Sequence, residues 1–265
     1  MREEKIKSKF LFNREQRLFL NFIDHTDQAD NAVKYINNVI GDKLLGSSKN
    51  ASKVEYLDIG CGYGYKTQAI ESLIKQKRSL NTVALDPSSE LLSIYREQNK
   101  SKNINFVCSD WESYQPSKKF DFITSIHTFY YMDNWKVQIT KMLESLNHQG
   151  DICIAIRSND QVCQFKDYFF NKINKHNKGE RNFNELCHTL DTIGVNYKSD
   201  IVESKLNISD CLSLNEKGKQ LIEFLLRTSY DGLDHDIKKD ISNYLEKNHS
   251  NNYLAHQDGF VWITH

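Results

Sequence analysis

Between residues 54 and 157 of this chain, short apolar runs alternate with segments whose apolar residues recur at the spacing of a helix. Val54–Ile59 is such a run, and the apolar residues that follow its glycine-rich end recur at the spacing of one helix face. Four further strands are predicted at 82–85, 104–108, 120–126 and 150–157. Because strands that alternate with helices need crossover connections, we predict an α/β fold with a mainly parallel sheet and helices on both faces.

The two ends of the chain do not continue this alternation of strands and helices. Residues 159–193 are predicted to be helical, 195–208 extended, 215–248 helical and polar, and 259–264 a closing strand. The residues ahead of the first strand include Phe10, Leu11, Phe12 and Phe22, which suit a helix lying over another surface. We predict that residues 1–50 form an N-terminal helical lid and that 51–265 form one domain, with a helical insertion at about 212–250 before the last strand.

Length and charge narrow the classes of function. The 265 residues suffice for one large domain with its own core. Thirty-five basic side chains balance thirty-five acidic ones, so no overall field attracts a polyanion. We therefore expect neither a nucleic acid nor a membrane as partner, and we expect a monomer.

The spacing of the cysteines and the length of the apolar runs indicate the cellular compartment in which the protein is expected. The six cysteines include no CxxC pair, and several lie in apolar runs, so we expect reduced, structural side chains in a cytoplasmic protein. The N-terminus lacks the continuous apolar stretch of a signal peptide, and no stretch approaches the roughly 18 apolar residues of a membrane span. We expect the protein to be neither secreted nor embedded in a membrane.

Candidate ligand-binding residues directly follow the predicted strands, because open α/β sheets bind ligands beyond the carboxyl ends of their strands. The glycines of Asp58-Ile59-Gly60-Cys61-Gly62-Tyr63-Gly64 allow a tight turn whose backbone amides approach a ligand closely. A dinucleotide-binding GxGxxG motif would need its third glycine where this chain has Tyr65, which disfavours a nicotinamide site.

The next two predicted strands are followed by carboxylates. Asp86, in Asp86-Pro87-Ser88, is placed to accept hydrogen bonds from two ribose hydroxyls, or else it caps the next helix. Ser109-Asp110-Trp111 offers a carboxylate for an adenine amino group and an indole to cover the ring, or else it forms an ordinary polar turn.

The order of these segments resembles one family. DIGCGYG, LDPS, CSDW, FDFITSIHTFYY and LNHQGDICIAI follow one another as in the class I S-adenosylmethionine-dependent methyltransferases. The resemblance implies a seven-stranded Rossmann-like sheet that ends in a reversed hairpin. It also implies S-adenosylmethionine as cofactor, S-adenosylhomocysteine as product and no metal. The cofactor-binding residues would then be Asp58, Gly60, Gly62, Gly64, Asp86, Pro87, Asp110, Trp111 and Ile126.

A closer resemblance to histamine N-methyltransferase and its relatives runs through FDFITSIHTFYYMDNW, LNISDC, QLIEFLLRTSYDG and FLNFIDHT. It implies that His127, Tyr130 and Tyr131 face the acceptor pocket and that segments around Gln28 and His256 close it. The polar residues differ from that enzyme, because Gln28 replaces a Glu, His256 an Asn and His127 a Gln. These changes argue against histamine itself and leave small-molecule methyl transfer.

The chemistry that this resemblance implies needs no covalent nucleophile. The acceptor atom has to be held at about 3 Å from the methyl carbon, and an amine or imidazole nitrogen must arrive without its proton. A histidine accepts such a proton at neutral pH, so we predict His127 as the catalytic residue and His256 as the second choice, unless they are polar turn residues. Tyr130 and Tyr131 would pack an aromatic acceptor or face the sulfonium, with one of the two expected in the core.

We therefore predict a methyltransferase that acts on a small-molecule amine or imidazole nitrogen. One alternative is a small-molecule O-methyltransferase, for an acceptor with a carboxylate or hydroxyl. A second is a regulator that binds S-adenosylmethionine without turnover. A nucleic-acid methyltransferase would need a basic face and usually an N/D-P-P-Y/F motif, where this chain has His127-Thr128-Phe129-Tyr130.

Overall fold

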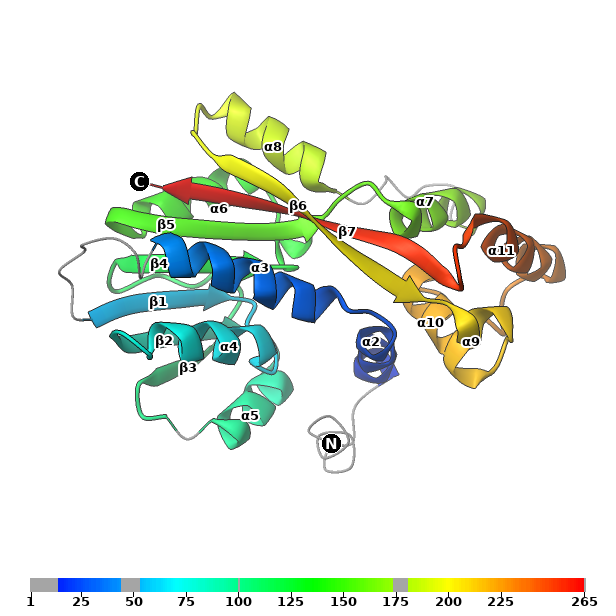
Figure 1. Cartoon of the computed structure of the whole chain (residues 1–265), viewed down its shortest axis with the longest axis horizontal. Coiled ribbons are helices and arrows are strands. Elements are labelled where there is room, and N and C mark those ends of the chain that lie inside the picture. The colour runs from blue at the N-terminus through cyan, green and yellow to red at the C-terminus, as the bar shows by residue number, and fades with distance from the viewer. Residues whose placement is uncertain (1–13, 44–52, 100, 174–180, 265) are drawn as a thin grey trace. The chain divides into compact units, whose positions relative to one another are not determined.

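A computed structural model describes residues 14–43, 53–99, 101–173 and 181–264 of the chain (Figure 1). The strands are β1 (Lys53–Ile59), β2 (Ser79–Asp86), β3 (Ile104–Cys108), β4 (Phe120–Ile126), β5 (Leu146–Arg157), β6 (Lys198–Asn207) and β7 (Tyr253–Thr264). They form a seven-stranded sheet in the order β3-β2-β1-β4-β5-β7-β6. The pairs from β3 to β5 are parallel, and β7 runs antiparallel to β5. The predicted mainly parallel sheet is confirmed.

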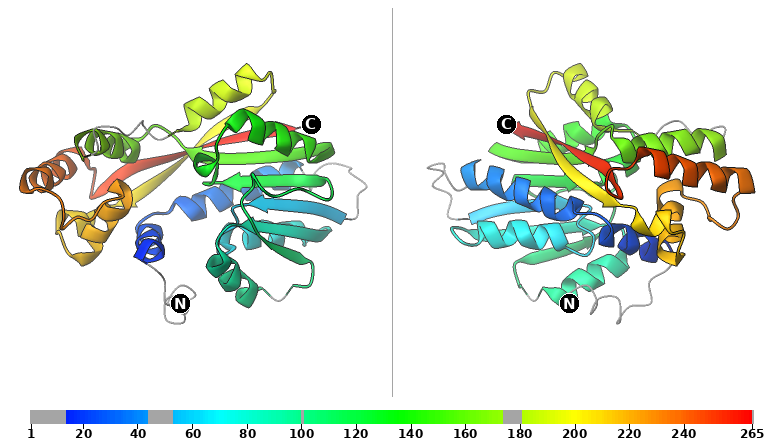
Figure 2. Two further views of the ribbon diagram at one scale, coloured as in Figure 1. Left: turned by 180° about the vertical axis from the view of Figure 1, so that it is seen from behind. Right: turned by 45° about the vertical axis from the view of Figure 1, so that its right-hand side comes forward.

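Helices cover both faces of this sheet. They are α3 (Gln28–Lys43), α4 (Tyr65–Ile74), α5 (Ser89–Gln98), α6 (Trp135–Glu144) and α8 (Phe183–Thr192). Ile36 of α3 and Ile70 of α4 pack with Phe122 of β4, while Ile139 of α6 packs with the next strand residue, Ile123. Successive strand residues point to opposite faces, so α3 and α4 lie on one face and α6 lies on the other, as Figure 1 and the view from behind in Figure 2 show.

Three strands are clearly longer than predicted, and the first of them is β2, which begins at Ser79 where the prediction began at residue 82. The predicted strand 150–157 is the second part of β5, which begins at Leu146, and the predicted strand 259–264 is the end of β7, which begins at Tyr253. In the added part of β7, Leu254 and His256 are buried while their neighbours Tyr253 and Ala255 are exposed. This alternation is weak in the sequence because a histidine occupies one of the buried positions.

The chain divides into two compact units. The first holds the described residues of Met1–Ala29, Ser158–Glu180 and Glu203–Gln257, and the second holds those of Asp30–Arg157, Arg181–Val202 and Asp258–His265. The segment predicted as a lid is therefore shared, because α2 (Arg14–Asp24) belongs to the first unit and nearly all of α3 to the second. Phe10, Leu11 and Phe12 lie outside the described residues. The action of residues 1–50 as a lid stays a prediction.

Helices make up most of the first unit. Besides α2 they are α7 (Gln161–Ile173), α9 (Ser209–Leu212), α10 (Glu216–Leu226) and α11 (His235–Asn248). Their core includes the buried residues Phe22, Phe165, Leu221 and Leu245. The segment 215–248, which the sequence analysis treats as one helical stretch, forms two helices because Arg227 ends α10 in a left-handed conformation with φ 51.

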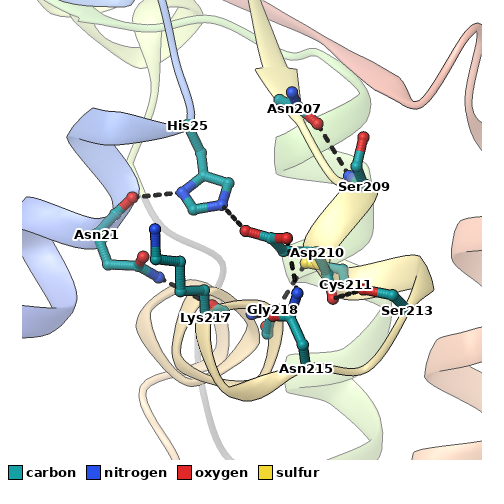
Figure 3. Close-up of polar contacts among 10 residues, drawn as sticks. All are labelled: Asn21, His25, Asn207, Ser209, Asp210, Cys211, Ser213, Asn215, Lys217 and Gly218. Carbon is teal, nitrogen blue, oxygen red and sulfur yellow. Dashed lines mark hydrogen bonds and ion pairs between the residues drawn. The ribbon is translucent and has the colours of Figure 1, made fainter.

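His25 connects α2 with the turn around α9 inside this first unit (Figure 3). Its Nδ1 lies 2.6 Å from the carbonyl oxygen of Asn21, and its Nε2 lies 2.9 Å from Oδ2 of Asp210. Asp210 also accepts a hydrogen bond from Nδ2 of Asn215 at 2.7 Å. Asn215 and then His25 lower the pKa of Asp210.

Asp210→Asn is expected to destabilise the protein at neutral pH by about 1–2 kcal/mol, since hydrogen bonds to a charged group contribute about 1.5–3 kcal/mol and partial exposure weakens them. Because folding lowers the pKa of Asp210, its stabilising contribution is present at neutral pH and is lost as the pH falls below the unfolded value of about 4. Urea unfolding at decreasing pH should show the difference shrinking. Exposed Glu246→Gln in α11 is the control, and a difference independent of pH would contradict the assignment.

Two further findings concern the predictions on cysteines and membranes. All six cysteines are free thiols, and Cys61, Cys153, Cys163 and Cys211 are buried. Within the ranges that the structure describes, no helix has both the length and the apolar character needed to cross a membrane.

Candidate functional site

The glycine-rich turn between β1 and α4 leaves one side open. The N–H of Gly60 donates to the carbonyl oxygen of Leu85 at 2.7 Å, which ties the turn to the end of β2. Gly60 and Gly62 have φ values of +75 and +56, which residues with a side chain rarely adopt. A Cβ at Gly60 would lie 1.9 Å from Cγ2 of Thr128, whereas a Cβ at Gly62 would meet no described atom within 4 Å. Gly60 is required by packing, and Gly62 leaves space for a ligand.

Asp86 lies at the end of β2 and anchors this turn. Its Oδ2 accepts a hydrogen bond from the N–H of Gly62 at 2.8 Å, and its Oδ1 accepts one from the N–H of Ser88 at 2.9 Å. Burial raises the pKa of Asp86, and these two amides oppose that shift. The cap of α5 is the Ser88 hydroxyl, which accepts from the N–H of Leu91. Each carboxylate oxygen can accept a second hydrogen bond, so the contact with ribose stays a prediction, as does the role of the adjoining Pro87.

Asp58 lies beneath the turn and contacts two hydroxyl groups. Oγ1 of Thr67 in α4 and Oγ1 of Thr124 in β4 donate to its two oxygens at 2.5 and 2.6 Å. The side chain is buried, and burial raises its pKa. Gly64 is the residue directly before α4 and faces the ring of Tyr95, which leaves no room for a Cβ. The structure therefore shows Asp58 and Gly64 joining the turn to its neighbours, and a direct cofactor contact of either remains untested.

The two residues predicted to bind the adenine lie in different environments. Asp110 is exposed, and its Oδ1 accepts a hydrogen bond from the N–H of Ser113 at 2.6 Å, which lowers its pKa. Trp111 is 2% exposed and belongs to the core, where its Nε1 donates to the carbonyl oxygen of Gln138 at 3.4 Å. The Lys141 ammonium lies 4.5 Å from its ring centroid. The indole is thus part of the core, and its predicted contact with a bound adenine ring stays a prediction.

His127 follows β4 directly, and its backbone is strained. Its φ is 59, a left-handed conformation that costs a residue with a side chain about 1–3 kcal/mol and is often found at functional sites. Its N–H donates to the carbonyl oxygen of Ala155 in β5 at 2.9 Å. Its Nε2 lies 3.1 Å from Oδ2 of Asp258 in β7, with the imidazole 14% exposed and the carboxylate fully buried. Ile126, the last residue of β4, is itself buried.

The two predicted tyrosines differ in their surroundings. The ring of Tyr130 lies 6.5 Å from that of His127, packs against the core, and has the Arg157 guanidinium 5.2 Å from its centroid. Tyr131 is 73% exposed. Tyr130 is therefore the one beside His127, and no contact with an acceptor is tested for either.

Gln28 and His256 contact each other within the first unit. Nε2 of Gln28 lies 2.9 Å from Nε2 of His256, and both side chains are buried. The ring of Phe22 lies 6.0 Å from that of His256. The fold thus brings together two residues that lie 228 positions apart in the sequence. Their role toward an acceptor remains a prediction.

Residues 57–150 match the family described as a methyltransferase domain. The plantazolicin methyltransferase BpumL, solved in complex with a triazolic desmethylPZN analog and SAH, has a TM-score of 0.54 with this chain at 15% identity, covering 94% of this chain and 91% of that one. This chain has the class I methyltransferase fold. At such low identity, the structural likeness concerns the fold alone.

Two curated relatives match part of the chain. An uncharacterized protein from Methanocaldococcus jannaschii is 26% identical over 154 residues, which cover 54% of this chain and 40% of the relative. A malonyl-[acyl-carrier protein] O-methyltransferase from Acetivibrio thermocellus is 28% identical over 122 residues, which cover 46% of this chain and 41% of the relative. The chain thus spans less than half the length of these relatives.

Three charged residues of the second unit were not predicted as site residues from the sequence. Asp258 lies in β7, one residue before the predicted strand 259–264 begins. Lys66 is the second residue of α4, and burial lowers its pKa while Asp58 and Asp258 oppose the shift. Arg157 is the last residue of β5. Ligands bind beyond the carboxyl ends of strands, the rule by which His127 was selected, so the sequence could have indicated Arg157 in the same way.

Among the residues that the structure describes, no group of three or more His, Cys, Asp or Glu side chains is arranged to hold a metal ion.

Proposed function

We propose that this chain is an S-adenosylmethionine-dependent methyltransferase that acts, as a monomer, on a small-molecule acceptor, with an amine or imidazole nitrogen favoured. The observation that carries the proposal is the open side of the turn at Gly62, directly beside the carboxylate of Asp86 at the ends of β1 and β2. Open α/β sheets bind ligands at this position, and the fold supports a methyltransferase.

The residues around the turn suit the parts of this cofactor. The open backbone at Gly62 admits close approach of the ligand, and Asp86 retains lone pairs for the ribose hydroxyls. The exposed carboxylate of Asp110 suits an adenine amino group. When bound, S-adenosylmethionine supplies a methyl group attached to a positively charged sulfur. His127 would hold the proton that a nitrogen acceptor gives up, and Tyr130 would pack against that acceptor.

O-methylation of a small molecule is the second candidate. The name of the Acetivibrio thermocellus relative supports it, since that protein is an O-methyltransferase. The resemblance of the sequence motifs to histamine N-methyltransferase supports a nitrogen acceptor instead. The changed polar residues argue against histamine as that acceptor. Balanced charge favours a small acceptor over a nucleic acid. A regulator without activity would bind S-adenosylmethionine and never release S-adenosylhomocysteine in the presence of any acceptor.

The test of the proposed function is a methyl-transfer screen with the purified chain. Biogenic amines, imidazoles, small hydroxylated compounds and small carboxylic acids are each added with S-adenosylmethionine, and release of S-adenosylhomocysteine is measured. Turnover with an amine or imidazole is the expected result. Turnover only with hydroxyl or carboxylate acceptors would support the second candidate, and cofactor binding without turnover across all classes would support the regulator.

His127→Ala is expected to lower turnover on the acceptor found in this screen by about 10²–10⁴-fold, the usual contribution of a general base. Affinity for S-adenosylhomocysteine, measured by calorimetry, should remain unchanged because the glycine turn and Asp86 do not involve the imidazole. His188→Ala, an exposed histidine in α8, is the matched control and should keep full turnover. An unaltered rate of His127→Ala would remove this residue from the reaction.

A further inference from the structure

His127 and Asp258 are held on opposite sides of the same strand. β5 lies between β4 and β7 in the sheet, and the N–H of His127 donates to Ala155 of β5. Asp258 pairs with Arg157, two residues further along β5. Both side chains are therefore carried by backbone that a central strand of the sheet holds in place, and they meet at 3.1 Å. Such pre-organisation is typical of groups that act together in a reaction.

The carboxylate oxygen of Asp258 in this contact determines which ring nitrogen of His127 carries the hydrogen. An ionised carboxylate only accepts hydrogen bonds, so Nε2 of His127 donates to Oδ2 of Asp258. In the neutral imidazole Nδ1 is then the basic atom, and it makes no hydrogen bond within the described part of the chain. The ring is 14% exposed, so a small molecule can reach it, whereas the carboxylate is fully buried.

We propose that Asp258 is a positioning residue that holds His127 with its hydrogen on Nε2, so that Nδ1 takes a proton from the acceptor. The pair then selects acceptors that must give up a proton, namely amines, imidazoles or hydroxyl compounds, over carboxylates, which are already ionised at neutral pH. This inference rests on the proposed function and narrows its acceptor class.

The proton and electron balance of the step is simple. The nucleophilic atom of the acceptor bonds to the methyl carbon, the carbon–sulfur bond breaks with its electron pair moving to sulfur, and the acceptor's proton passes to Nδ1 of His127. The carboxylate of Asp258 stabilises the resulting imidazolium, and the proton leaves to solvent afterwards.

Other charged and titratable groups surround this pair. Tyr130 lies beside the imidazole with the Arg157 guanidinium over its ring, and Lys66 of α4 is coupled electrostatically to Asp258. Asp258 contacts the imidazole directly, with 3.1 Å between its Oδ2 and Nε2 of His127. The proton-accepting behaviour of His127 is therefore expected to depend on Asp258 more than on either cation.

The first test reads the tautomer and needs no methyl transfer. Long-range ¹H–¹⁵N spectra of the wild-type protein with ¹⁵N-labelled histidine, assigned with His127→Gln, should show the hydrogen of neutral His127 on Nε2. In Asp258→Asn the amide can donate to Nε2, so the hydrogen should move toward Nδ1. A hydrogen on Nδ1 in the wild-type protein would overturn the proposal, and this result stands even if the variant fails to fold.

The second test uses the acceptor from the screen. Asp258→Asn is expected to reduce kcat by about 10²–10⁴-fold, as for loss of a base held in its working tautomer, with affinity for S-adenosylhomocysteine unchanged. The wild-type rate should fall toward acid pH as the imidazole gains a proton, and this acid limb should vanish in His127→Gln. A best acceptor that is a carboxylic acid, with a rate indifferent to Asp258→Asn, would overturn the proposal. No turnover together with the expected tautomer would contradict the proposed function and leave the pairing intact.

Discussion

Asp86→Ala is expected to weaken binding of S-adenosylhomocysteine by at least about 100-fold, since two hydrogen bonds to a charged group contribute about 1.5–3 kcal/mol each. The substitution removes the acceptor proposed for the ribose hydroxyls. It also releases the N–H of Gly62, which Asp86 holds at 2.8 Å in the turn. Both losses act on the same ligand, which makes this the variant with the largest expected effect on cofactor affinity.

Calorimetry measures this effect, and circular dichroism shows whether the fold persists. Glu144→Ala is the control, because Glu144 is an exposed carboxylate at the end of α6 in the same unit. Burial raises the pKa of Asp86, so protonation on the acid side should weaken binding at a higher pH than it would for an exposed aspartate. Unchanged affinity of Asp86→Ala would show that the ribose assignment is wrong.

Gly60→Ala and Gly62→Ala are expected to separate folding from binding. Both positions have positive φ, which costs an alanine about 1–2 kcal/mol. At Gly60 the new methyl group would also collide with Thr128, so Gly60→Ala should lose about 3 kcal/mol or more of stability once overpacking is added. At Gly62 the methyl group points into open space, and Gly62→Ala should fold with only the smaller loss while binding the cofactor at least about tenfold more weakly, a change of about 1.4 kcal/mol.

Urea unfolding and calorimetry on the two variants provide the comparison, with each serving as the other's control. Normal affinity for S-adenosylhomocysteine in Gly62→Ala would mean that the open side of the turn holds no ligand. Equal stability of the two variants would mean that Thr128 moves aside and that packing does not require a glycine at position 60.

Two strands were predicted with the bounds that the structure shows. The predicted strands 104–108 and 120–126 coincide with β3 and β4, although β3, at the edge of the sheet, has no buried residue. The start of β7 was missed because His256 occupies an inward position there. The break between α10 and α11 was also missed, since Arg227 carries no glycine or proline signal for its left-handed conformation.

Individual site residues were less predictable than the strands that carry them. Position after a strand selected Asp86 and His127, and both lie at the carboxyl ends of their strands. The same rule placed Trp111 against a ligand, although its indole lies in the core. Backbone position determines which residues are near the site, but the direction of a side chain depends on packing partners from distant parts of the chain.

The sequence by itself determined the α/β class, the glycine-rich turn and the carboxylate after the second strand, because each depends on residues close together in the chain. Only the tertiary structure decided that Asp258 lies against His127, 131 positions earlier, and that Gln28 meets His256. The physical reason is that strand order and register bring such residues together, through hydrogen bonds between strands that local patterns do not specify.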